Sequence, residues 1–435
     1  MTHAMNRVLK RSLALACSLA LATAVAACGG SGNSNSNSGG SSQNVPGVTD
    51  TEVVVGSHQP LTGPAAPGYS KIAPATKAYF DYVNAHGGVN GRKITYKYLD
   101  DGYNPSNTQQ VVRQLVLQDK VFAILNGLGT PTHAGVLDFL KSNRVPDLFV
   151  ASGALEWNQP TKYPYTFGYQ PNYTVESKVL ATYVKQTYAG QKVCFLGQND
   201  DFGRDGLSGV EKILGPTGLA AKDTYVPTNT NVAPQIGKFK AAACTVVMLD
   251  TVPGFTALVL GTAAKLAYKP NWVVSSVGAD YKTLASRLGT AGTPLLDGLV
   301  GAGYLPAVDD DTNPWTQLFK KINSDAKGPE FDGNVMYGFS VGYLFVEALK
   351  KAGKNLTRQG IVDAIEKGGF TGPGIVPLQY SKTNHSGYGG VQLAKISGGK
   401  QLPFGAIYTT DDGDGAITEY KEAPSVPSAD GIPAA

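Results

Sequence analysis

The feature that most constrains the fold is a repeated alternation of short apolar runs with amphipathic segments. Residues 53–56 have the pattern of a buried strand, and apolar side chains recur at helical spacing over residues 72–83. Residues 94–98 alternate as a second strand, and Asn104-Pro105 opens a second helix. Strand, helix, strand and helix in this order predict a parallel sheet with helices on both faces.

The same alternation begins again after residue 169. A helix is predicted over residues 175–188, followed by strands at 193–196, 223–226, 246–249 and 272–275. A long helical region is expected over residues 314–367, with strands near 376–380 and 390–396. Two successive α/β units predict two similar lobes, in keeping with a length greater than one core usually serves.

The N-terminal residues have the pattern of a targeting signal. Arg7, Lys10 and Arg11 precede an apolar run over residues 13–27, and small residues stand directly before Cys28. This pattern predicts a lipoprotein signal peptide over residues 1–27, with Cys28 acylated as the new N-terminus. Residues 28–47 are an uncharged Gly/Ser/Asn linker, with a reach of roughly 25 Å as a random coil. We therefore expect an extracytoplasmic body that is lipid-anchored to the cell membrane.

The composition argues against nucleic acid, metals and nucleotide cofactors as partners. Without the signal peptide the chain has 34 Lys and Arg against 33 Asp and Glu, because three of its 37 basic residues are removed. No basic cluster with interleaved aromatic residues occurs, so nucleic-acid binding is not expected. The five histidines show no metal-ligand spacing, and neither a P-loop nor a complete dinucleotide fingerprint is present. We expect no cofactor and no metal site.

Two cysteines remain in the mature chain, because Cys17 leaves with the signal peptide and Cys28 carries the lipid. Cys194 and Cys244 each stand at the start of an apolar run. If those runs are neighbouring parallel strands, the two thiols lie within disulfide reach, and an extracytoplasmic location favours oxidation. The alternative is a pair of buried free thiols that pack as small hydrophobic groups.

Two motifs match known sites only superficially. Gly-Phe-Ser-Val-Gly around Ser340 has the spacing of a nucleophile elbow, with Asp363 and His385 following in hydrolase order. However, Ser340 lies within an apolar helical run over residues 335–349 rather than after a buried strand, so a secreted Ser hydrolase is a remote alternative and no catalytic residue is expected. Residues 411–415 faintly resemble a calcium loop, but Thr410 and Lys421 occupy the positions of its outer ligands, which favours a solvated acidic turn.

Ligands of open α/β sheets bind at the carboxyl ends of the strands. Six loops follow predicted strands in this way, at residues 57–69, 126–133, 151–155, 198–204, 250–254 and 276–280. Two lobes with facing strand ends would gather all six around one cleft, which suits capture of a small molecule by hinge closure. The loop at 126–133 enters a helix, and N–H groups at a helix start attract a carboxylate. A tight turn with a threonine cap explains the same residues, and both interpretations can hold together.

Over residues 51–413 the chain resembles the Leu/Ile/Val-binding family, the substrate-binding proteins of branched-chain amino-acid-type ABC importers. The resemblance rests on Pro60-Leu61-Thr62-Gly63-Pro64, Gly87-Gly88-Val89-Asn90-Gly91-Arg92-Lys93-Ile94, Asp100-Asp101 followed by Asn104-Pro105, and Asn199-Asp200-Asp201-Phe202-Gly203. It implies a type I periplasmic-binding-protein fold, in which two doubly wound α/β lobes joined by three crossover segments hold the ligand in the interlobe cleft. The crossovers are expected near residues 165–171, 300–304 and 372–378.

This resemblance also implies domain boundaries. We expect an N-terminal lobe of residues 48–168 plus 303–373 and a C-terminal lobe of residues 169–302 plus 374–413. Residues 414–435 would then form a flexible tail.

The resemblance further implies a ligand site. It places a ligand carboxylate against Gly129 and Thr130, with the backbone of Gly153 and Ala154 beside it. The same correspondence has Tyr69 walling the near lobe and Phe202 covering the ligand from the far lobe.

Three positions depart from the family pattern. Leu155 replaces a hydroxyl residue, Thr251 stands where an aromatic residue is often found, and Val277 replaces the acid that pairs with the ligand ammonium. A buried ammonium group without a partner is strongly disfavoured. The ammonium partner is therefore one of three nearby acids, or the ligand has no ammonium group; those acids are Asp200, Asp250 and Asp280.

The function implied by the resemblance is solute binding without chemistry. The chain is expected to bind a small organic acid, amino acid or amide by hinge closure and to deliver it to the permease of an ABC importer. The departures favour a more apolar acid or an amide. The alternative is a ligand-sensing receptor of the same fold that feeds a signalling pathway.

Overall fold

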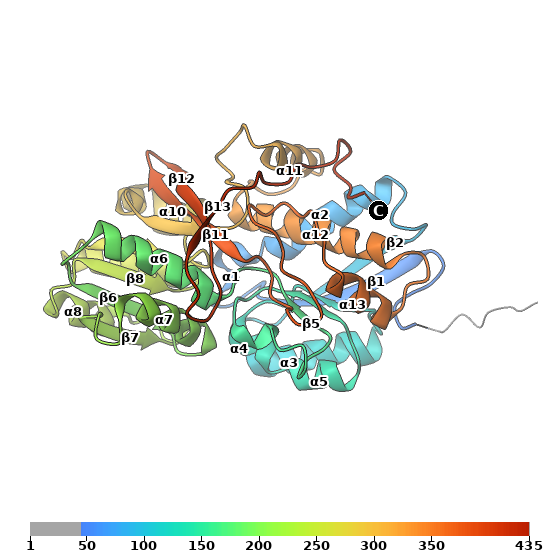
Figure 1. Cartoon of the computed structure of the whole chain (residues 1–435), viewed down its shortest axis with the longest axis horizontal. Helices are drawn as coiled ribbons and strands as arrows, with labels where there is room; N and C mark the ends of the chain where they lie inside the picture. Colours follow the sequence, from blue (N-terminus) through green and yellow to red (C-terminus); the bar gives the residue numbers. More distant parts are fainter. Residues whose placement is uncertain (1–44, 435) are drawn as a thin grey trace, which may run out of the picture. The chain divides into compact units, whose positions relative to one another are not determined.

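The computed structural model describes residues 45–434, so the predicted signal peptide, Cys28 and most of the linker lie outside the described residues. The described chain contains two twisted sheets, each flanked by helices (Figure 1). The first is fully parallel, as predicted. Its strand order is β2 (Lys93–Asp100), β1 (Glu52–Gln59), β3 (Ile124–Leu125), β4 (Asp147–Val150) and β5 (Thr166–Gly168).

The second sheet is mixed. Five strands are parallel, in the order β7 (Ala221–Tyr225), β6 (Val193–Gln198), β8 (Val246–Asp250), β9 (Asn271–Val274) and β10 (Val300–Gly303). Three antiparallel strands extend it beyond β10, in the order β11 (Gly390–Ser397), β12 (Lys400–Thr409) and β13 (Thr418–Tyr420). The inner parallel strands β6, β8 and β9 are almost entirely buried, because helices cover both faces, whereas the edge strand β7 is partly exposed.

Helices of the first lobe come from two distant parts of the sequence. α12 (Gly333–Ala352) packs along α2 (Ile72–Ala85), and this close approach requires the small residues of the Gly-Phe-Ser-Val-Gly motif. A side chain on Gly338 would overlap Ile72 O, and one on Gly342 would lie 2.8 Å from the Tyr79 ring. The other helices of this lobe are α1 (Ala66–Tyr69), α3 (Pro105–Arg113), α4 (Thr130–Ala134), α5 (Leu137–Ser142), α11 (Pro314–Asp325) and α13 (Arg358–Glu366), with a π-helical turn at Gln114–Gln118 and a 3₁₀ turn at Leu155–Trp157.

The second lobe has its own helices and its own core, centred on the strands β6, β8 and β9. Its helices are α6 (Tyr173–Thr187), α7 (Asp201–Leu214), α8 (Ala233–Ala241), α9 (Pro253–Lys265) and α10 (Tyr281–Gly292), with a 3₁₀ turn at Thr293–Leu296. No helix within residues 45–434 combines the length and the apolar composition needed to cross a bilayer.

The chain passes three times between the lobes. It leaves the first sheet after β5, returns from β10 to α11, and crosses again from α13 to β11. Each lobe is therefore built from discontinuous sequence, in the topology of a type I periplasmic binding protein. The exact lobe boundaries given above remain predictions.

Four local expectations differ from the structure. The helix expected after the loop at residues 126–133 is two short helices, α4 and α5, separated by Gly135 and Val136. Residues 376–380 form no strand, although Leu378 makes an isolated bridge to Tyr388. β12 was not predicted, because its half-buried residues lack a continuous apolar run. The linker also ends before residue 47, since Gly47 O accepts a hydrogen bond from Val54 N.

Residues 414–434 also differ from the flexible tail that their composition predicted. Thr418–Tyr420 pairs with β12 as β13, and Trp315 Nε1 donates a hydrogen bond to Ser425 O. Tyr79 OH donates to Gly431 O at 2.8 Å, and Ile432 is buried against the first lobe. Proline removes backbone donors, but side chains of the body supply the hydrogen bonds that hold this segment.

Cys194 and Cys244 form a disulfide, with a Cα–Cα distance of 5.9 Å. The pairing follows from the sheet, because β6 and β8 are neighbouring parallel strands and Cys244 lies two residues before β8 begins.

The acidic turn at residues 411–415 is built around a cation from the chain itself. Lys178 Nζ, which is buried, donates hydrogen bonds to Thr410 Oγ1 at 2.8 Å and to the carbonyl oxygens of Asp411, Gly413 and Gly415 at 2.9–3.0 Å. The turn therefore differs from a fully solvated one. Its likeness to a calcium loop has a physical basis, since its oxygens converge on the ammonium group of Lys178.

Ser340 lies inside α12, as its apolar surroundings predicted. Its hydroxyl is fully buried and donates a hydrogen bond to Met336 O at 2.8 Å. This position is one that a nucleophile elbow cannot adopt, because the elbow exposes its serine after a strand.

Candidate ligand-binding site

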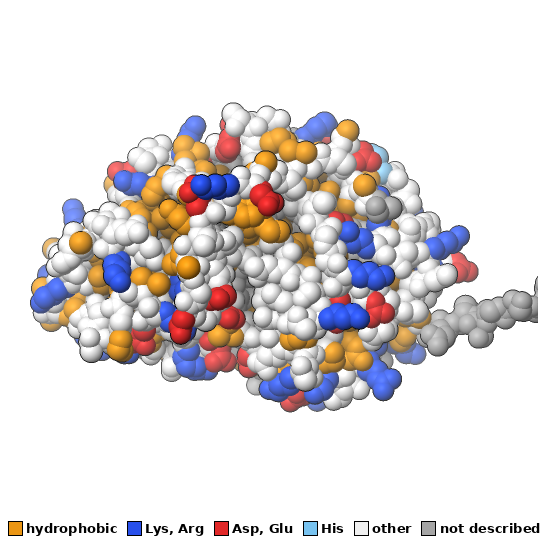
Figure 2. All heavy atoms as spheres, viewed as in Figure 1, with side chains coloured by type: hydrophobic (Ala, Val, Ile, Leu, Met, Phe, Trp, Pro, Cys, Tyr) orange, Lys and Arg blue, Asp and Glu red, His pale blue; other side chains and the backbone are white. Residues whose placement is uncertain are grey.

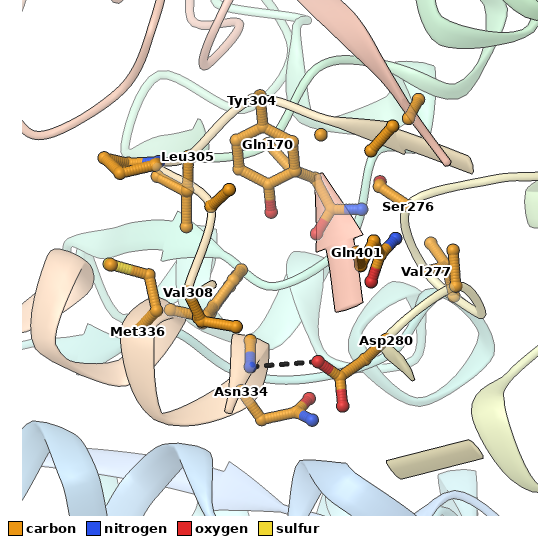
Figure 3. A pocket seen from close by; sticks show the side chains of 18 of the residues that line it. Gln170, Ser276, Val277, Asp280, Tyr304, Leu305, Val308, Asn334, Met336 and Gln401 are labelled. Atoms are coloured by element: carbon orange, nitrogen blue, oxygen red, sulfur yellow. Dashed lines mark hydrogen bonds between the residues drawn. The ribbon is translucent and has the colours of Figure 1, made fainter. Parts of the chain in front are cut away.

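A cavity of about 320 Å³ lies between the lobes, where the carboxyl ends of the parallel strands of both sheets meet (Figure 3). Its volume is at the lower end of the range for small-molecule sites. The near lobe lines it with Tyr69, Ile72, Tyr103, Leu128, Gly129, Thr130 and Ala151, and the far lobe with Tyr173, Phe202, Val252, Ser276, Val277, Ala279 and Asp280.

The loop between β3 and α4 forms the polar end of the cavity. Gly129 has φ 107°, a left-handed conformation that favours glycine, and a side chain there would overlap Thr132 Oγ1. Thr130 Oγ1 lies 2.7 Å from Ser152 Oγ and 3.4 Å from Tyr173 OH. Burial raises the pKa of Tyr173 to about 12, so its phenol remains a neutral hydrogen-bond donor. Hydroxyl groups from both lobes therefore meet beside this loop.

A chain of four buried side chains supports the loop from behind. Asp101 Oδ2 lies 2.8 Å from His58 Nδ1, His58 Nε2 lies 2.9 Å from His133 Nδ1, and His133 Nε2 lies 2.8 Å from Asp147 Oδ2. All four side chains are fully buried. Burial lowers the pKa of His58, while its hydrogen bond to Asp101 acts in the opposite direction. Because His133 is part of α4, this chain ties the loop to β1 and β4.

The sequence offered no signal for this chain, because its four residues come from four separate segments. Within the described part of the chain, no group of three or more His, Cys, Asp or Glu side chains is arranged to hold a metal ion.

The far-lobe wall is held by a buried carboxyl group. Glu176 on α6 accepts hydrogen bonds from the backbone N–H and the hydroxyl of Ser276, which lines the cavity. Burial raises the pKa of Glu176 to about 7, and the two hydrogen bonds from Ser276 limit that rise. The Phe202 ring packs against Tyr173, with 4.5 Å between the ring centroids, and closes this side.

Six of the predicted ligand-site residues line the cavity: Tyr69, Gly129, Thr130, Phe202, Val277 and Asp280. The others lie outside its lining. In the loop after β4, Ala151 lines the cavity, whereas the predicted Gly153, Ala154 and Leu155 do not. The reason is that β4 ends at Val150 and the chain then turns away from the cavity. Gly153 packs against Pro171 O, and Leu155 N donates a hydrogen bond to Asp205 Oδ2 in the far lobe.

On the far lobe Val252 lines the cavity in place of Thr251. The Thr251 hydroxyl is buried and lies 2.7 Å from Thr256 Oγ1. Each of the six predicted loops thus contributes to the cavity lining, but in two of them a different residue from the predicted one lies there.

Of the three acids considered for an ammonium group, only Asp280 reaches the cavity. Its carboxylate accepts hydrogen bonds from Thr283 N at 2.8 Å and Gly333 N at 2.9 Å. Burial and the nearby charge of Asp332 raise the pKa of Asp280.

The other two acids are used elsewhere. Asp200 accepts from Phe202 N as the N-cap of α7. Asp250 is buried, and a side chain on Gly206 would overlap it. Burial raises its pKa well above the ordinary range, and the nearby Glu176 raises it further.

Hydrogen bonds join the lobes across the cleft, so the structure shows a closed arrangement. Tyr69 OH donates to Val277 O at 2.8 Å, and Gln198 Nε2 donates to Tyr103 OH at 3.1 Å. Asp280 joins α10 to the first turn of α12, and Asn334 Nδ2 donates to Thr283 Oγ1 at 3.1 Å beside it. The dashed line in Figure 3 marks the bond that Asp280 accepts.

The crossover after β10 was expected from the sequence, but not as a wall of the cavity. Residues 302–308 line the cavity without interruption, together with Met336 and Tyr337 of α12. Their apolar composition resembles that of a buried strand, so nothing in the local pattern marks them as lining residues.

Comparisons with known proteins agree with this geometry. A family model described as periplasmic binding protein matches residues 52–401. The Leu/Ile/Val-binding protein homolog 2 of Brucella abortus (strain 2308) is 26% identical over 340 residues, which cover 74% of this chain and 85% of the relative.

Solved structures share the fold at low sequence identity. A branched-chain amino acid ABC transporter protein from Thermus thermophilus with bound valine superposes with a TM-score of 0.74 at 21% identity, covering 84% of this chain and 98% of that one. A fatty acid ABC transporter substrate-binding protein from Thermomonospora curvata has a TM-score of 0.74 at 22% identity, covering 84% and 95%. An extracellular ligand-binding receptor from Rhodopseudomonas palustris HaA2 has a TM-score of 0.69 at 19% identity, covering 81% and 100%.

The family match covers most of the chain, and the two-lobed topology with its interlobe cavity agrees with it. The chain belongs to the periplasmic binding protein family.

Proposed function

We propose that this protein is the extracytoplasmic solute-binding component of an ABC importer, anchored through lipid on Cys28, and that it delivers a small organic acid to a membrane permease. The observation that carries the proposal is the cavity between two lobes that hydrogen bonds hold together. Relatives whose names include Leu/Ile/Val binding and ABC transport support the importer role.

The proposed mechanism is capture by closure, without covalent chemistry. The ligand first sits on the near-lobe loop at Gly129 and Thr130. The far lobe then rotates until Tyr69 reaches Val277 and Phe202 covers the ligand. Such closure shifts the population towards the form that the permease recognises.

The polar end of the cavity suits a carboxylate. Thr130 and Tyr173 place hydroxyl groups beside Gly129, whose own N–H donates to Ala151 O, and hydrogen bonds to a charged acceptor are stronger than those to a neutral one. Among the described residues that line the cavity there is no Lys, Arg, His or Glu. Recognition of the carboxylate would therefore rest on neutral donors.

An ammonium group has a poorer fit. Val277 occupies the position that the family resemblance assigns to the ammonium-binding acid, and Asp280 already accepts two backbone hydrogen bonds. An amine-free acid or an amide therefore fits better than an amino acid. The printed names of the solved relatives include both a valine complex and a fatty acid transporter protein, so both classes of ligand belong in the test.

A thermal-shift screen of the mature protein tests the proposal. A ligand that binds only the folded state raises the melting temperature by mass action, by an amount equivalent to about 2.7 kcal/mol at 100 times Kd. We expect amine-free carboxylates to raise it and leucine, isoleucine and valine to raise it less. Equal or greater stabilisation by the three amino acids would contradict the preference, and no shift with any small organic solute would contradict the function.

Thr130→Val tests the carboxylate site. The valine keeps the shape of threonine but removes the hydroxyl, so we expect carboxylate affinity to fall by about 10- to 150-fold, because a hydrogen bond to a charged group contributes about 1.5–3 kcal/mol. Thr228→Val makes the same change at an exposed position and serves as the control. Unchanged affinity in the Thr130 variant, with an unchanged melting temperature, would exclude this loop from the site.

A sensor of the same fold is the second candidate, and it has support in the neighbour named as an extracellular ligand-binding receptor. Permease and ATPase genes beside the coding sequence would favour import, whereas a histidine kinase gene would favour sensing.

A further inference from the structure

The cavity continues beyond the strand-end loops into a second, apolar part. We call this part the hinge compartment and define it by Tyr304, Leu305, Val308, Met336 and Ile407. These residues come from the crossover after β10, from α12 and from β12. Figure 3 shows Leu305, Val308 and Met336 grouped on one side of the cavity, with Ser276, Val277 and Asp280 on the opposite side.

Three polar side chains near this compartment have partners in the protein. Gln392 Nε2 donates a hydrogen bond to Gly405 O at 2.8 Å, and Gln401 Oε1 accepts one from Tyr281 N at 3.1 Å. Asp310 accepts from Thr312 N at 3.0 Å. Among the described residues, no hydrogen-bond partner faces the Gln170 amide or the Tyr304 hydroxyl, which also line the cavity. An aliphatic ligand group placed beside Leu305, Val308 and Met336 leaves the three bonds intact and removes apolar surface from water.

Gly303 lies in the cavity lining beside Tyr304 of the hinge compartment. It lies at the end of β10, and a side chain built on it meets no atom within 4 Å. Most glycines around the site lack such space: side chains on Gly127 and Gly129 would meet neighbouring atoms. A side chain at Gly303 would therefore cause no steric clash, but it would occupy space in the cavity.

The hinge compartment also reaches the molecular surface. Pro403 on β12 and Pro424 line the cavity and are exposed. In Figure 2 hydrophobic side chains gather around the hollow in this region, where β11 and β12 lie. A ligand chain longer than the enclosed space therefore has an apolar path towards solvent.

We propose that the hinge compartment binds the aliphatic chain of the ligand, and that the substrate is a carboxylic acid with an unbranched chain longer than the side chain of leucine. This inference rests on the proposed function, since the carboxylate would sit at Gly129 and Thr130. The chain would then lie along Gly303 and between Leu305, Val308 and Met336. Specificity would come from the crossover and β12 rather than from the strand-end loops.

Isothermal titration of the full chain with propanoate, hexanoate and decanoate tests the proposal, at concentrations where the acids are monomeric. Transfer of methylene groups from water predicts that affinity rises by up to about fourfold per added methylene. We expect decanoate to bind at least 100-fold more tightly than propanoate. Gly303→Leu should reduce decanoate affinity at least tenfold and leave propanoate affinity within about twofold.

Gly237→Leu is the matched control, because a side chain at Gly237 on α8 also meets no atom within 4 Å and Gly237 does not line the cavity. This variant should bind all three acids like the unsubstituted protein. The chain-length series on the unsubstituted protein needs no variant, so it stands even if Gly303→Leu folds poorly.

Affinity that does not change with chain length would overturn the hinge-compartment proposal and leave the proposed function intact, provided that propanoate or valine binds. Equal weakening of propanoate and decanoate by Gly303→Leu would also overturn it. If no acid and no amino acid binds, the proposed function fails together with this inference.

Discussion

Glu176 offers a sharp test of the electrostatics behind the cavity wall. Its carboxyl group is buried, and its pKa rises from the ordinary 4.5 to about 7. A carboxyl group whose pKa is raised on folding stabilises the protein fully below its unfolded pKa. That stability is lost as the pH rises from about 4.5 through about 7, because the folded state must then hold a buried charge.

The expected size follows from the two pKa values. Their difference corresponds to about 3 kcal/mol at 1.36 kcal/mol per pH unit, as an upper value for the loss above pH 7. Glu176→Gln keeps the shape and remains neutral, and its amide oxygen can still accept the hydrogen bond from Ser276 N. We therefore expect the variant and the unsubstituted protein to be similar at pH 4.5, and the variant to be about 3 kcal/mol more stable at pH 8.

Urea unfolding at pH 4.5, 6, 7 and 8, followed by circular dichroism, measures both free energies of unfolding. Glu330→Gln makes the same substitution at an exposed carboxylate, 3.6 Å from Lys282, and controls for the change of residue itself. Parallel pH profiles of the Glu176 variant and the unsubstituted protein would refute the reasoning. They would show that Glu176 is as easily ionised in the folded state as in the unfolded chain.

Two further predictions concern the second lobe. Lys178→Met should lower the free energy of unfolding by about 3–5 kcal/mol, because it leaves four converging oxygen atoms without their buried cation. The control Lys212→Met should lower it by less than about 1 kcal/mol, because Lys212 makes only a surface ion pair with Asp414 in the same turn. Urea unfolding of the two variants measures both values, and equal effects would contradict the prediction. Replacing Cys194 and Cys244 together by alanine should lower the free energy of unfolding by about 4 kcal/mol, because the disulfide closes a loop of 50 residues. Urea unfolding measures this value too. A decrease below about 1 kcal/mol would show that the disulfide constrains the unfolded chain little.

The alternation of apolar runs and amphipathic helices determined most of the fold. Strand β1 contains Val53 and Val55, and helix α2 presents the apolar face from Ile72 to Val83, as the sequence predicted. A strand and a helix that pack in one α/β layer each need their own spacing of apolar residues, and that spacing is visible in the sequence. The two apolar runs after Cys194 and Cys244 likewise became neighbouring strands, β6 and β8, which bring the two cysteines close together.

Local sequence patterns did not predict the structure of segments that are held by residues distant in the sequence. Residues 418–434 appear unstructured by composition, but Tyr79 and Trp315 provide the hydrogen bonds that hold them. The turn at residues 411–415 appeared solvated until Lys178, more than 200 residues away in the sequence, supplied its cation.

For the candidate site, too, some features could be predicted from the sequence and others could not. The sequence by itself determined which strand-end loops surround the cavity, because parallel strands place their carboxyl ends at one edge. Only the tertiary structure decided which residues face the cavity. The chain bends at Ser152, so Ala151 lines the cavity and Gly153 does not. The tertiary structure also decided that the crossover from Gly303 to Val308 forms a wall, because that depends on how three distant segments pack and not on any local period.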